Sequence, residues 1–263
     1  MVKPVLIENL FFAYQKDYIL KNISLSIEEN DFVALIGPNG SGKTTLLSLL
    51  WAWLRPQEGL LLIEGQNIKS FKPKRLAQQI AQVSQDFRGD LAFTVWETVL
   101  LGRSPYQGLS NSLTDLDLLK AQEAISLTGI QHLKDRFLFT LSGGELKRVL
   151  IALALAQDTK ILLLDEPTAH LDLHYEYEIL LLLKKLQRER HIALIVTFHD
   201  LNLASLYADR VILLDKGQIV AVGKPEEVIR QDILEMVYGN GFTLLAHPLN
   251  GKPCVLPVFT LPS

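Results

Sequence analysis

The sequence predicts an α/β fold in which buried strands alternate with helices around a mostly parallel sheet. Three apolar runs are typical of strands buried on both faces: residues 32–36, 161–164 and 193–198. A helix is predicted after each run: from about Lys43 to Leu54, at 175–190 and at 201–207. Two runs with alternating apolar and polar residues, 5–14 and 19–27, precede these elements and predict an antiparallel pair of strands.

Between the predicted strands, residues 88–158 are rich in helix signals. Thr114 can cap a helix that runs to about Leu127 and is closed by Gly129. Loops are expected at 102–108 and 110–114, and a helix at 225–238. Because no Pro- or Ser-rich linker borders this region, we expect an inserted helical lobe and not an independent domain.

Composition excludes several classes of protein. The 263 residues carry a net charge of −3 and 48% apolar side chains, so no basic surplus indicates nucleic acid or anionic lipid as a partner. A single cysteine, Cys254, cannot form an internal disulfide and favours a reducing compartment. The first residues do not resemble a signal peptide, and no apolar run reaches the roughly 20 residues that span a bilayer.

The residues after the strand at 32–36 fit a phosphate-binding loop. Gly37, Gly42, Lys43 and Thr44 match the pattern G-x-x-x-x-G-K-[ST], with a strand before it and a helix after it. The glycines allow backbone N–H groups to surround an anion at the helix N-terminus. Lys43 can reach the β- and γ-phosphates, and the Thr44 hydroxyl can ligate Mg²⁺. A glycine-rich connection without a ligand is the less favoured interpretation.

Two further motifs carry chemistry. Asp165 and Glu166 end an apolar strand, where open α/β sheets place their ligands. After a phosphate loop, these carboxylates indicate a Mg²⁺ ligand and a residue that handles the attacking water, although a solvated turn is the simpler alternative. Ser142 and Glu145 have capping-box spacing, and the paired glycines between them would let a second body approach the helix N-terminus.

The sequence leaves open which aromatic residue contacts a nucleotide and what role each histidine has. Phe11, Phe12 and Tyr14 end the first strand run, and spacing alone does not decide which of them could stack on an adenine. His199 follows a strand and is better placed than the other histidines to meet a phosphate. A metal site built on His170 and His174 is not favoured, because no further Cys or His lies near them in the sequence.

Taken together, the motifs resemble the nucleotide-binding subunit of ATP-binding cassette (ABC) transporters over nearly the whole chain. The discriminating piece is Leu141-Ser-Gly-Gly144, combined with Asp165-Glu166, the following Leu171-Asp172, and His199. The resemblance implies a P-loop NTPase (RecA-like) core with an N-terminal antiparallel β subdomain and an inserted α-helical subdomain. It implies one ABC ATPase domain over 1–263: a core of 1–87 and 159–230, a helical signature subdomain of 88–158, and a C-terminal extension of 231–263.

The resemblance also implies roles for individual residues. Tyr14 would stack on adenine, and Ser142, Gly143, Gly144 and Glu145 would complete the ATP site of an opposite subunit. Gln85, Asp165 and Thr44 would contact Mg²⁺, Glu166 would be the base for water, and His199 and Lys43 would hold the γ-phosphate. The phosphate loop would consist of Gly37, Pro38, Asn39, Gly40, Ser41, Gly42, Lys43, Thr44 and Thr45. Glu145 departs from the usual glutamine, and His170 from the usual small residue.

Within the family, residues 99–106, 199–209 and 247–253 resemble ATPases that import iron–siderophore, haem or cobalamin. The expected protein is an importer ATPase that forms a homodimer around two ATP molecules and binds Mg²⁺. Two transmembrane permease subunits and, indirectly, an extracytoplasmic binding protein are the expected partners, and the cytoplasmic face of the cell membrane is the expected location. The alternatives are a soluble ABC ATPase of DNA repair or translation, which usually carries two cassettes or coiled insertions, and a regulatory module without turnover.

Overall fold

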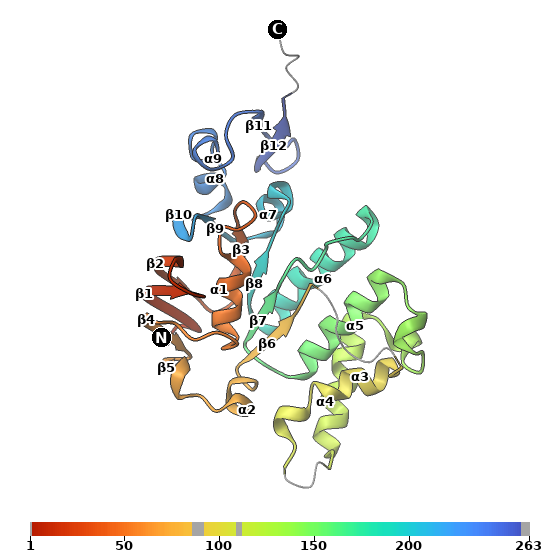
Figure 1. The fold of residues 1–263 in the computed structure, drawn as a ribbon. Helices are drawn as coiled ribbons and strands as arrows, with labels where there is room; N and C mark the ends of the chain where they lie inside the picture. The colour runs from red at the N-terminus through yellow and green to blue at the C-terminus, as the bar shows by residue number, and fades with distance from the viewer. Residues whose placement is uncertain (1, 86–91, 109–111, 259–263) are drawn as a thin grey trace. The chain divides into compact units, whose positions relative to one another are not determined.

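The computed structural model describes residues 2–85, 92–108 and 112–258, and its packing divides the chain into two compact units. The first unit comprises residues 1–69 and 195–263, and the second comprises residues 70–194 (Figure 1). The division falls inside strand β8 (Ala193–Thr197). The phosphate loop and the C-terminal segment therefore share one unit, and the carboxylate and Leu-Ser-Gly-Gly motifs share the other.

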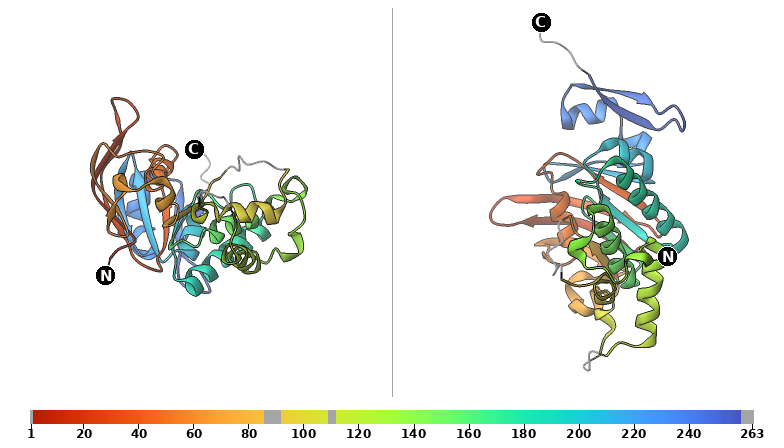
Figure 2. Two further views of the ribbon diagram at one scale, coloured as in Figure 1. Left: turned by 90° about the horizontal axis from the view of Figure 1, so that it is seen from below. Right: turned by 90° about the vertical axis from the view of Figure 1, so that its right-hand side faces the viewer.

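An antiparallel sheet in the order β2-β1-β4-β5 forms one layer of the first unit. Its strands are β1 (Val5–Ala13), β2 (Tyr18–Ile27), β4 (Glu58–Ile63) and β5 (Gln66–Asn67). Val5 is paired with Ile27 on one side and with Ile63 on the other, and all three side chains are buried. Figure 2 shows β1 and β2 side by side as a long hairpin. The antiparallel pair predicted at 5–14 and 19–27 is confirmed.

The phosphate loop of the first unit leaves a fully buried strand. All five residues of β3 (Phe32–Ile36) are buried, as expected for a strand covered on both faces. This strand lies parallel to β9 (Arg210–Asp215), which is antiparallel to β10 (Gln218–Gly223). The amide of Phe198, just after β8, donates to the oxygen of Leu35 at 3.1 Å. The carboxyl ends of β3 and β8 therefore lie next to each other.

Helix α1 (Lys43–Leu50) follows the loop and is shorter than the predicted extension to residue 54. Ala52, with a φ of 59°, has left-handed backbone that no helix can continue. The remaining elements of the first unit are α7 (Leu201–Tyr207), α8 (Pro225–Val228), α9 (Gln231–Tyr238), β11 (Phe242–Ala246) and β12 (Pro253–Pro257). The prediction of one helix at 225–238 is wrong, because Arg230 is extended and its guanidinium holds the Asp232 carboxylate at the start of a new helix.

In the second unit, two parallel strands carry the carboxylate motif. β6 (Ile80–Val83) lies beside β7 (Ile161–Leu164), whose four residues are all buried. The amide of Ala193, which begins β8, donates to the oxygen of Lys160 at 2.9 Å. Helix α6 (Leu173–Arg190) buries one apolar side, as its sequence predicts. Helix α2 (Pro73–Leu76) precedes β6.

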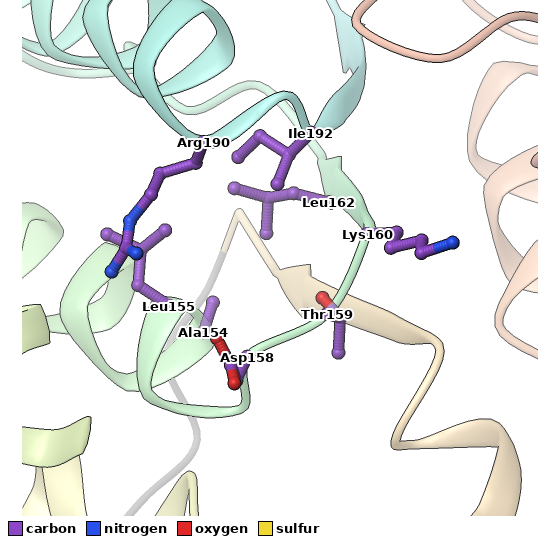
Figure 3. Close-up of a pocket in the computed structure, with 8 residues that line it drawn as sticks. All are labelled: Ala154, Leu155, Asp158, Thr159, Lys160, Leu162, Arg190 and Ile192. Carbon is purple, nitrogen blue, oxygen red and sulfur yellow. The ribbon is translucent and has the colours of Figure 1, made fainter.

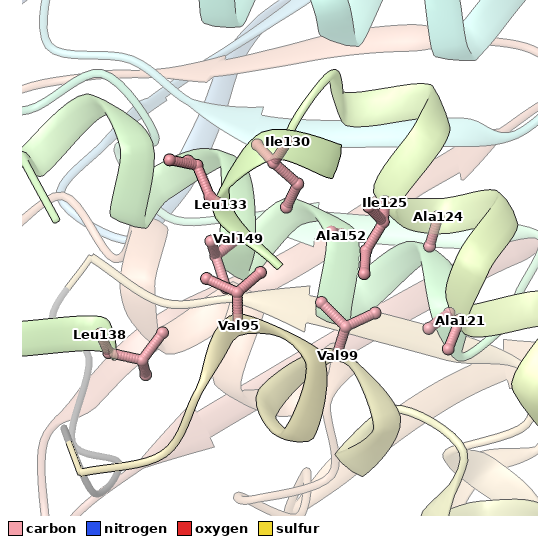
Figure 4. Packing of buried hydrophobic residues seen from close by; sticks show 11 residues of the cluster. Val95, Val99, Ala121, Ala124, Ile125, Ile130, Leu133, Leu138, Val149 and Ala152 are labelled. Atoms are coloured by element: carbon pink, nitrogen blue, oxygen red, sulfur yellow. The ribbon is translucent and has the colours of Figure 1, made fainter. Parts of the chain in front are cut away.

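Helices α3 (Val95–Leu101), α4 (Asp115–Thr128) and α5 (Gly143–Ala156) enclose a hydrophobic cluster of the second unit. Figure 4 shows Val95 and Val99 of α3 facing Val149 and Ala152 of α5, with Ile125 of α4 beside them. Thr114 caps α4, and Gly129 ends it with a φ of 72°, as predicted. Short 3₁₀ helices complete the described chain: Ile68–Ser70, Ser104–Tyr106, Gln131–Leu133 and Leu138–Thr140.

A buried ion pair joins the three helices. The Arg103 guanidinium contacts the Asp117 carboxylate at 3.0 Å and the oxygen of Ala156 at 2.6 Å. Arg103 and Asp117 are only 2% and 3% exposed, so removal of either would leave a buried charge without its partner. Helices α3, α4 and α5 are therefore held together by an ion pair as well as by apolar packing. Its predicted boundary at residues 87 and 88, and residues 110 and 111 of the predicted loop, lie outside the described residues.

Candidate nucleotide-binding and hydrolysis site

The phosphate loop is shaped by close backbone contacts. Gly37 follows β3, and a Cβ atom built at this position would lie 2.1 Å from the oxygen of Leu214 in β9. Its φ of 148° is also strained for any residue with a side chain. Only glycine allows the chain to turn here, so the fold requires glycine at the first position of the motif.

Lys43 lies inside the loop that it ends. Its Nζ donates to the oxygens of Gly37 at 2.7 Å and Pro38 at 3.0 Å, and the residue is 8% exposed. The hydroxyl of Ser41 is buried, and no hydrogen-bond partner for it lies among the described residues. A buried hydroxyl without a partner is costly unless a ligand satisfies it. An ammonium group and this hydroxyl in one glycine-rich turn fit the oxygens of a phosphate chain.

Among the three candidate aromatic residues, exposure separates Tyr14 from Phe12. Tyr14 is 62% exposed, and its hydroxyl lies 3.5 Å from the Thr45 hydroxyl at the end of the phosphate loop. Phe12 is 5% exposed and packs edge-on against the Tyr14 ring, with 5.0 Å between centroids. Phe11 packs in the same way on Tyr18 at 5.3 Å. A ring that is open to solvent beside the loop is available to stack on a base.

Tyr238, which the sequence does not single out, also contacts the phosphate loop. Its hydroxyl is hydrogen-bonded to the Gly37 backbone, although 37% of the residue is exposed. Desolvation of the hydroxyl is the largest effect and raises the pKa of Tyr238 to about 12. The contact with Gly37 places Tyr238, the last residue of α9, against the phosphate loop.

The carboxylates of the second unit lie at the carboxyl end of β7. The amide of Asp165 donates to the oxygen of Val83 at 3.0 Å, which aligns this end with β6. Glu166 has a φ of 44°, a left-handed conformation that costs free energy in a residue with a side chain. Gln85, two residues beyond β6, donates its Nε2 to Glu166 Oε2 at 3.1 Å. The structure therefore brings together Gln85 and Glu166, which are 81 positions apart in the chain.

The residues expected to hold Mg²⁺ divide between the units. Gln85 and Asp165 belong to the second unit and Thr44 to the first. Because the Gln85 nitrogen faces Glu166, its amide oxygen is the atom left for a metal. A carboxylate, an amide oxygen and a hydroxyl are the hard oxygen donors that Mg²⁺ prefers, so the donor set fits this ion. Within the described residues, no group of three or more His, Cys, Asp or Glu side chains is arranged to hold a metal ion.

The Leu-Ser-Gly-Gly motif opens α5 with the predicted capping box. The Ser142 hydroxyl accepts from the Glu145 amide at 3.3 Å, and the Glu145 carboxylate accepts from the Ser142 amide at 2.8 Å. That backbone hydrogen bond is the main reason why the pKa of Glu145 is lowered. Ser142 and Gly143 are exposed, so the start of the helix is accessible to a ligand.

Gly144, by contrast, is buried by its own subunit. A Cβ atom at this position would lie 2.3 Å from the Tyr175 ring of α6. The second glycine of the motif is therefore required by packing on α6, and not only by the approach of another body. Gly143 leaves more room, with the Leu171 side chain 3.6 Å from the corresponding position.

A buried lysine that sequence reasoning missed links α5 to Gln85. Lys147 is 7% exposed, and its Nζ donates to the oxygens of Ser84 and Gln85, each at 3.4 Å. A lysine three residues after Gly144 carries no sequence signal that could have revealed this contact. Together these residues form a connected set in the second unit, from the capped helix through Lys147 to Gln85 and Glu166.

His199 lies in the first unit, directly after β8 and Phe198. The hydrogen bond between Phe198 and Leu35 places it beside the end of β3, from which the phosphate loop departs. His199 is exposed, as a phosphate contact would require. His170 lies outside α6 and has a φ of 63°, whereas His174 is on the helix and lies 3.5 Å from Glu178. The two do not share a helix face.

A pocket of about 190 Å³ lies elsewhere in the second unit (Figure 3). It is lined by residues of the α5 end, the start of β7 and the α6 end: Ala154, Leu155, Asp158, Thr159, Lys160, Leu162, Arg190 and Ile192. None of the residues predicted to bind nucleotide lines it, so it does not contribute to that site.

Comparison with known proteins identifies the family. The sequence profile of the ABC transporter family matches residues 20–169, which is more than half of the chain. The chain belongs to the ABC transporter family. The chain is an ATPase of this family, and it has the fold of the family's ATP-binding cassettes.

Curated members of the ABC transporter family match most of the chain. The ferric enterobactin transport ATP-binding protein FepC of Escherichia coli is 38% identical over 95% of this chain and 93% of its own length. The hemin import ATP-binding protein HmuV of Nocardia farcinica is 40% identical over 91% and 82%. The ABC transporter ATP-binding protein YvrA of Bacillus subtilis is 40% identical over 95% of this chain, which spans 57% of the length of YvrA.

Solved ABC structures have the same fold. An inward-facing transporter assigned to the metal-chelate type superimposes with a TM-score of 0.85 at 28% identity, covering 98% of both chains. The dimeric post-hydrolysis cassette MJ0796, bound to ADP and Pi, gives a TM-score of 0.72 at 31% identity, covering 84% of this chain and 98% of that one. The α/β cassette fold predicted from the sequence is confirmed.

Proposed function

We propose that this chain is the ATP-hydrolysing subunit of an importer that takes up a metal chelate of the iron–siderophore, haem or cobalamin type. The observation that carries the proposal is the set of importer ATPases that match nearly end to end, together with the metal-chelate transporter at a TM-score of 0.85. The described residues include no helix that is long and apolar enough to cross a bilayer. Two permease subunits would supply the membrane path, with the chain bound at the cytoplasmic face.

In the proposed reaction, ATP binds to the phosphate loop of one subunit and to Ser142, Gly143, Gly144 and Glu145 of a second. Lys43 neutralises charge on the β- and γ-phosphates, and the partnerless Ser41 hydroxyl gains an acceptor. Tyr14 stacks on the adenine. Thr44, Asp165 and the Gln85 oxygen would hold Mg²⁺, which would supply further positive charge at the phosphates.

Glu166 takes a proton from the attacking water. Its Oε2 accepts the hydrogen bond from Gln85, which orients the carboxylate for this role. His199 donates to the γ-phosphate as charge develops on it. The chain's contribution is therefore positioning and charge neutralisation, which dominate phosphoryl transfer.

A purification from membranes tests transport. The tagged chain is isolated from detergent-solubilised membranes, and hydrophobic subunits that co-purify are identified, with a Glu166→Gln variant in parallel to trap the assembled state. Uptake of labelled ferric siderophore, haem and cobalamin is then compared in cells with and without the chain. We expect permease subunits to co-purify with the chain. We also expect cells without the chain to lose uptake of one of the three chelates. Recovery with ribosomes or DNA and without membrane protein would instead support the DNA-repair or translation class.

A further inference from the structure

The C-terminal hairpin β11–β12 is fastened to helix α7 in the first unit, and Figure 1 shows the two side by side. Just before β12, Lys252 donates its Nζ to the oxygens of Ser205, Leu206 and Ala208 at 2.8, 3.0 and 3.4 Å. These carbonyls lie at the C-terminal end of α7, where backbone oxygens lack partners within the helix. A lysine ammonium satisfies them and also interacts favourably with the helix dipole.

A second set of contacts runs along the same face of α7. The Asn202 amide pairs with the backbone of Val255 as a neighbouring strand would: its Oδ1 accepts at 2.7 Å and its Nδ2 donates at 3.2 Å. One turn further on, the buried Ser205 hydroxyl donates to the oxygen of Pro253 at 2.7 Å. The hairpin therefore holds both the first and the last turn of the helix.

Helix α7 in turn sets the place of His199. Asp200 is its N-cap, with Oδ1 accepting from the amides of Asn202 at 2.6 Å and Leu203 at 3.4 Å. His199 is the single residue between this cap and Phe198, which is fixed to β3. A helix of seven residues is too short to hold its position by its own hydrogen bonds. Its anchorage must come from outside, and the hairpin provides much of it.

We propose that the C-terminal hairpin is a positioning element for ATP hydrolysis, and that Lys252 and Asn202 act through α7 to hold His199 at the γ-phosphate. The proposal rests on the proposed role of His199. Both are positioning residues, because neither is among the residues proposed to bind the nucleotide. The same C-terminal segment also reaches the phosphate loop through Tyr238, so residues of 231–257 support two parts of the nucleotide site.

The test compares Lys252→Met with Lys252→Arg in the full chain, with Lys3→Met as the matched control. Lys3 is a cation of the same unit that binds Ser26 and Glu28, away from α7. We expect Lys252→Met to lower kcat about 10-fold or more, since small misplacements of catalytic groups have effects of this size. Affinity for a non-hydrolysable ATP analogue should change less than about twofold, because the phosphate loop is intact. Lys252→Arg should restore most of the rate.

A double-mutant cycle with His199→Ala separates positioning from general damage. If Lys252 acts through His199, Lys252→Met lowers kcat no further in the His199→Ala background. An equal loss in both backgrounds, or kcat that follows the folded fraction, would overturn the proposal. Asn202→Ser repeats the cycle in case Lys252→Met fails to fold. If His199→Ala hydrolysed ATP at a near-native rate, the proposed role of the histidine would be refuted. If His199→Ala lost hydrolysis while Lys252→Met hydrolysed ATP at the native rate, only the positioning role of the hairpin would be overturned.

Discussion

At the scale of single residues, the central finding is the contact between Gln85 and Glu166. The backbone of Glu166 is left-handed, and its Oε2 accepts a hydrogen bond from the Gln85 side chain. The orientation of the carboxylate is therefore set before any substrate binds. Strain of this kind persists only where surrounding contacts enforce it, and it concentrates at functional sites. The geometry therefore supports Glu166 as the residue that handles water.

Substituting Glu166 with glutamine keeps the size of the side chain and removes its basicity. We expect kcat for ATP hydrolysis to fall by about 10²–10⁴-fold, the range for loss of a positioned general base. ATP binding should persist, because Lys43 and the phosphate loop are unchanged. Single-turnover hydrolysis and equilibrium nucleotide binding measure the two effects, and turnover close to that of the native protein would remove Glu166 from this role.

Tyr14→Ala is expected to weaken ATP binding by about 1–3 kcal/mol, the usual range for base–aromatic stacking. Tyr14→Phe is the control, since it keeps the ring and loses only the hydroxyl near Thr45. Phe12→Ala should act mainly on stability, at about 3–5 kcal/mol, because Phe12 is buried. Calorimetric titration and thermal unfolding distinguish the two. If Phe12→Ala weakened ATP binding in fully folded protein and Tyr14→Ala did not, the aromatic would be wrongly assigned.

At the scale of elements, the first turn of α5 is both capped within its own subunit and exposed to solvent. The capping box of Ser142 and Glu145 stabilises the helix within the subunit, while Ser142 and Gly143 stay exposed. Glu145 also lies 3.7 Å from Arg136, so the carboxylate has an ionic contact that glutamine could not make. The departure from glutamine at this position is thus compatible with the fold.

Glu145→Gln should change how stability depends on pH. Because the folded-state pKa of Glu145 is lowered, its stabilising effect is present above the unfolded-state pKa and is lost as pH falls. The free-energy difference between the native protein and Glu145→Gln should therefore shrink as pH is lowered through the acidic range. Chemical denaturation at a series of pH values measures it. Glu97→Gln, in the equivalent capping box of α3, should behave similarly; a difference that does not vary with pH would contradict the argument.

At the scale of the whole molecule, the proposed site residues fall into two groups. Tyr14, the phosphate loop and His199 belong to the first unit, and Gln85, Asp165, Glu166 and the Leu-Ser-Gly-Gly motif belong to the second. Exposure of Ser142 and Gly143 leaves that motif open to a second copy of the chain. The related cassette MJ0796 is dimeric.

A mixing experiment tests whether two copies share their sites. One subunit carries Ser142→Arg, which should block its phosphate contact by bulk, and the other carries Lys43→Ala, which should abolish tight ATP binding. In a shared arrangement, a mixed dimer has one doubly defective site and one intact site, so mixing two inactive proteins should restore some hydrolysis. Capping alone predicts that Ser142→Arg lowers stability, by about 0.5–2 kcal/mol for a lost N-cap, with activity following the folded fraction. If mixed dimers are shown to form but remain inactive, the hypothesis that a single intact shared site can hydrolyse ATP is contradicted.

The sequence by itself determined the features that depend on near neighbours in the chain. The strand, glycine-rich turn and helix around Lys43, and the capping boxes at Thr114 and Ser142, follow from hydrophobic periodicity and from hydrogen bonds over three or four residues. Tertiary packing decided the rest. It buries Phe12 and leaves Tyr14 open, joins Gln85 to Glu166, places Lys147 against Gln85, and ties Lys252 to α7. These contacts join residues that are far apart in the chain, so their distances and burial depend on how whole elements pack, which no local pattern encodes.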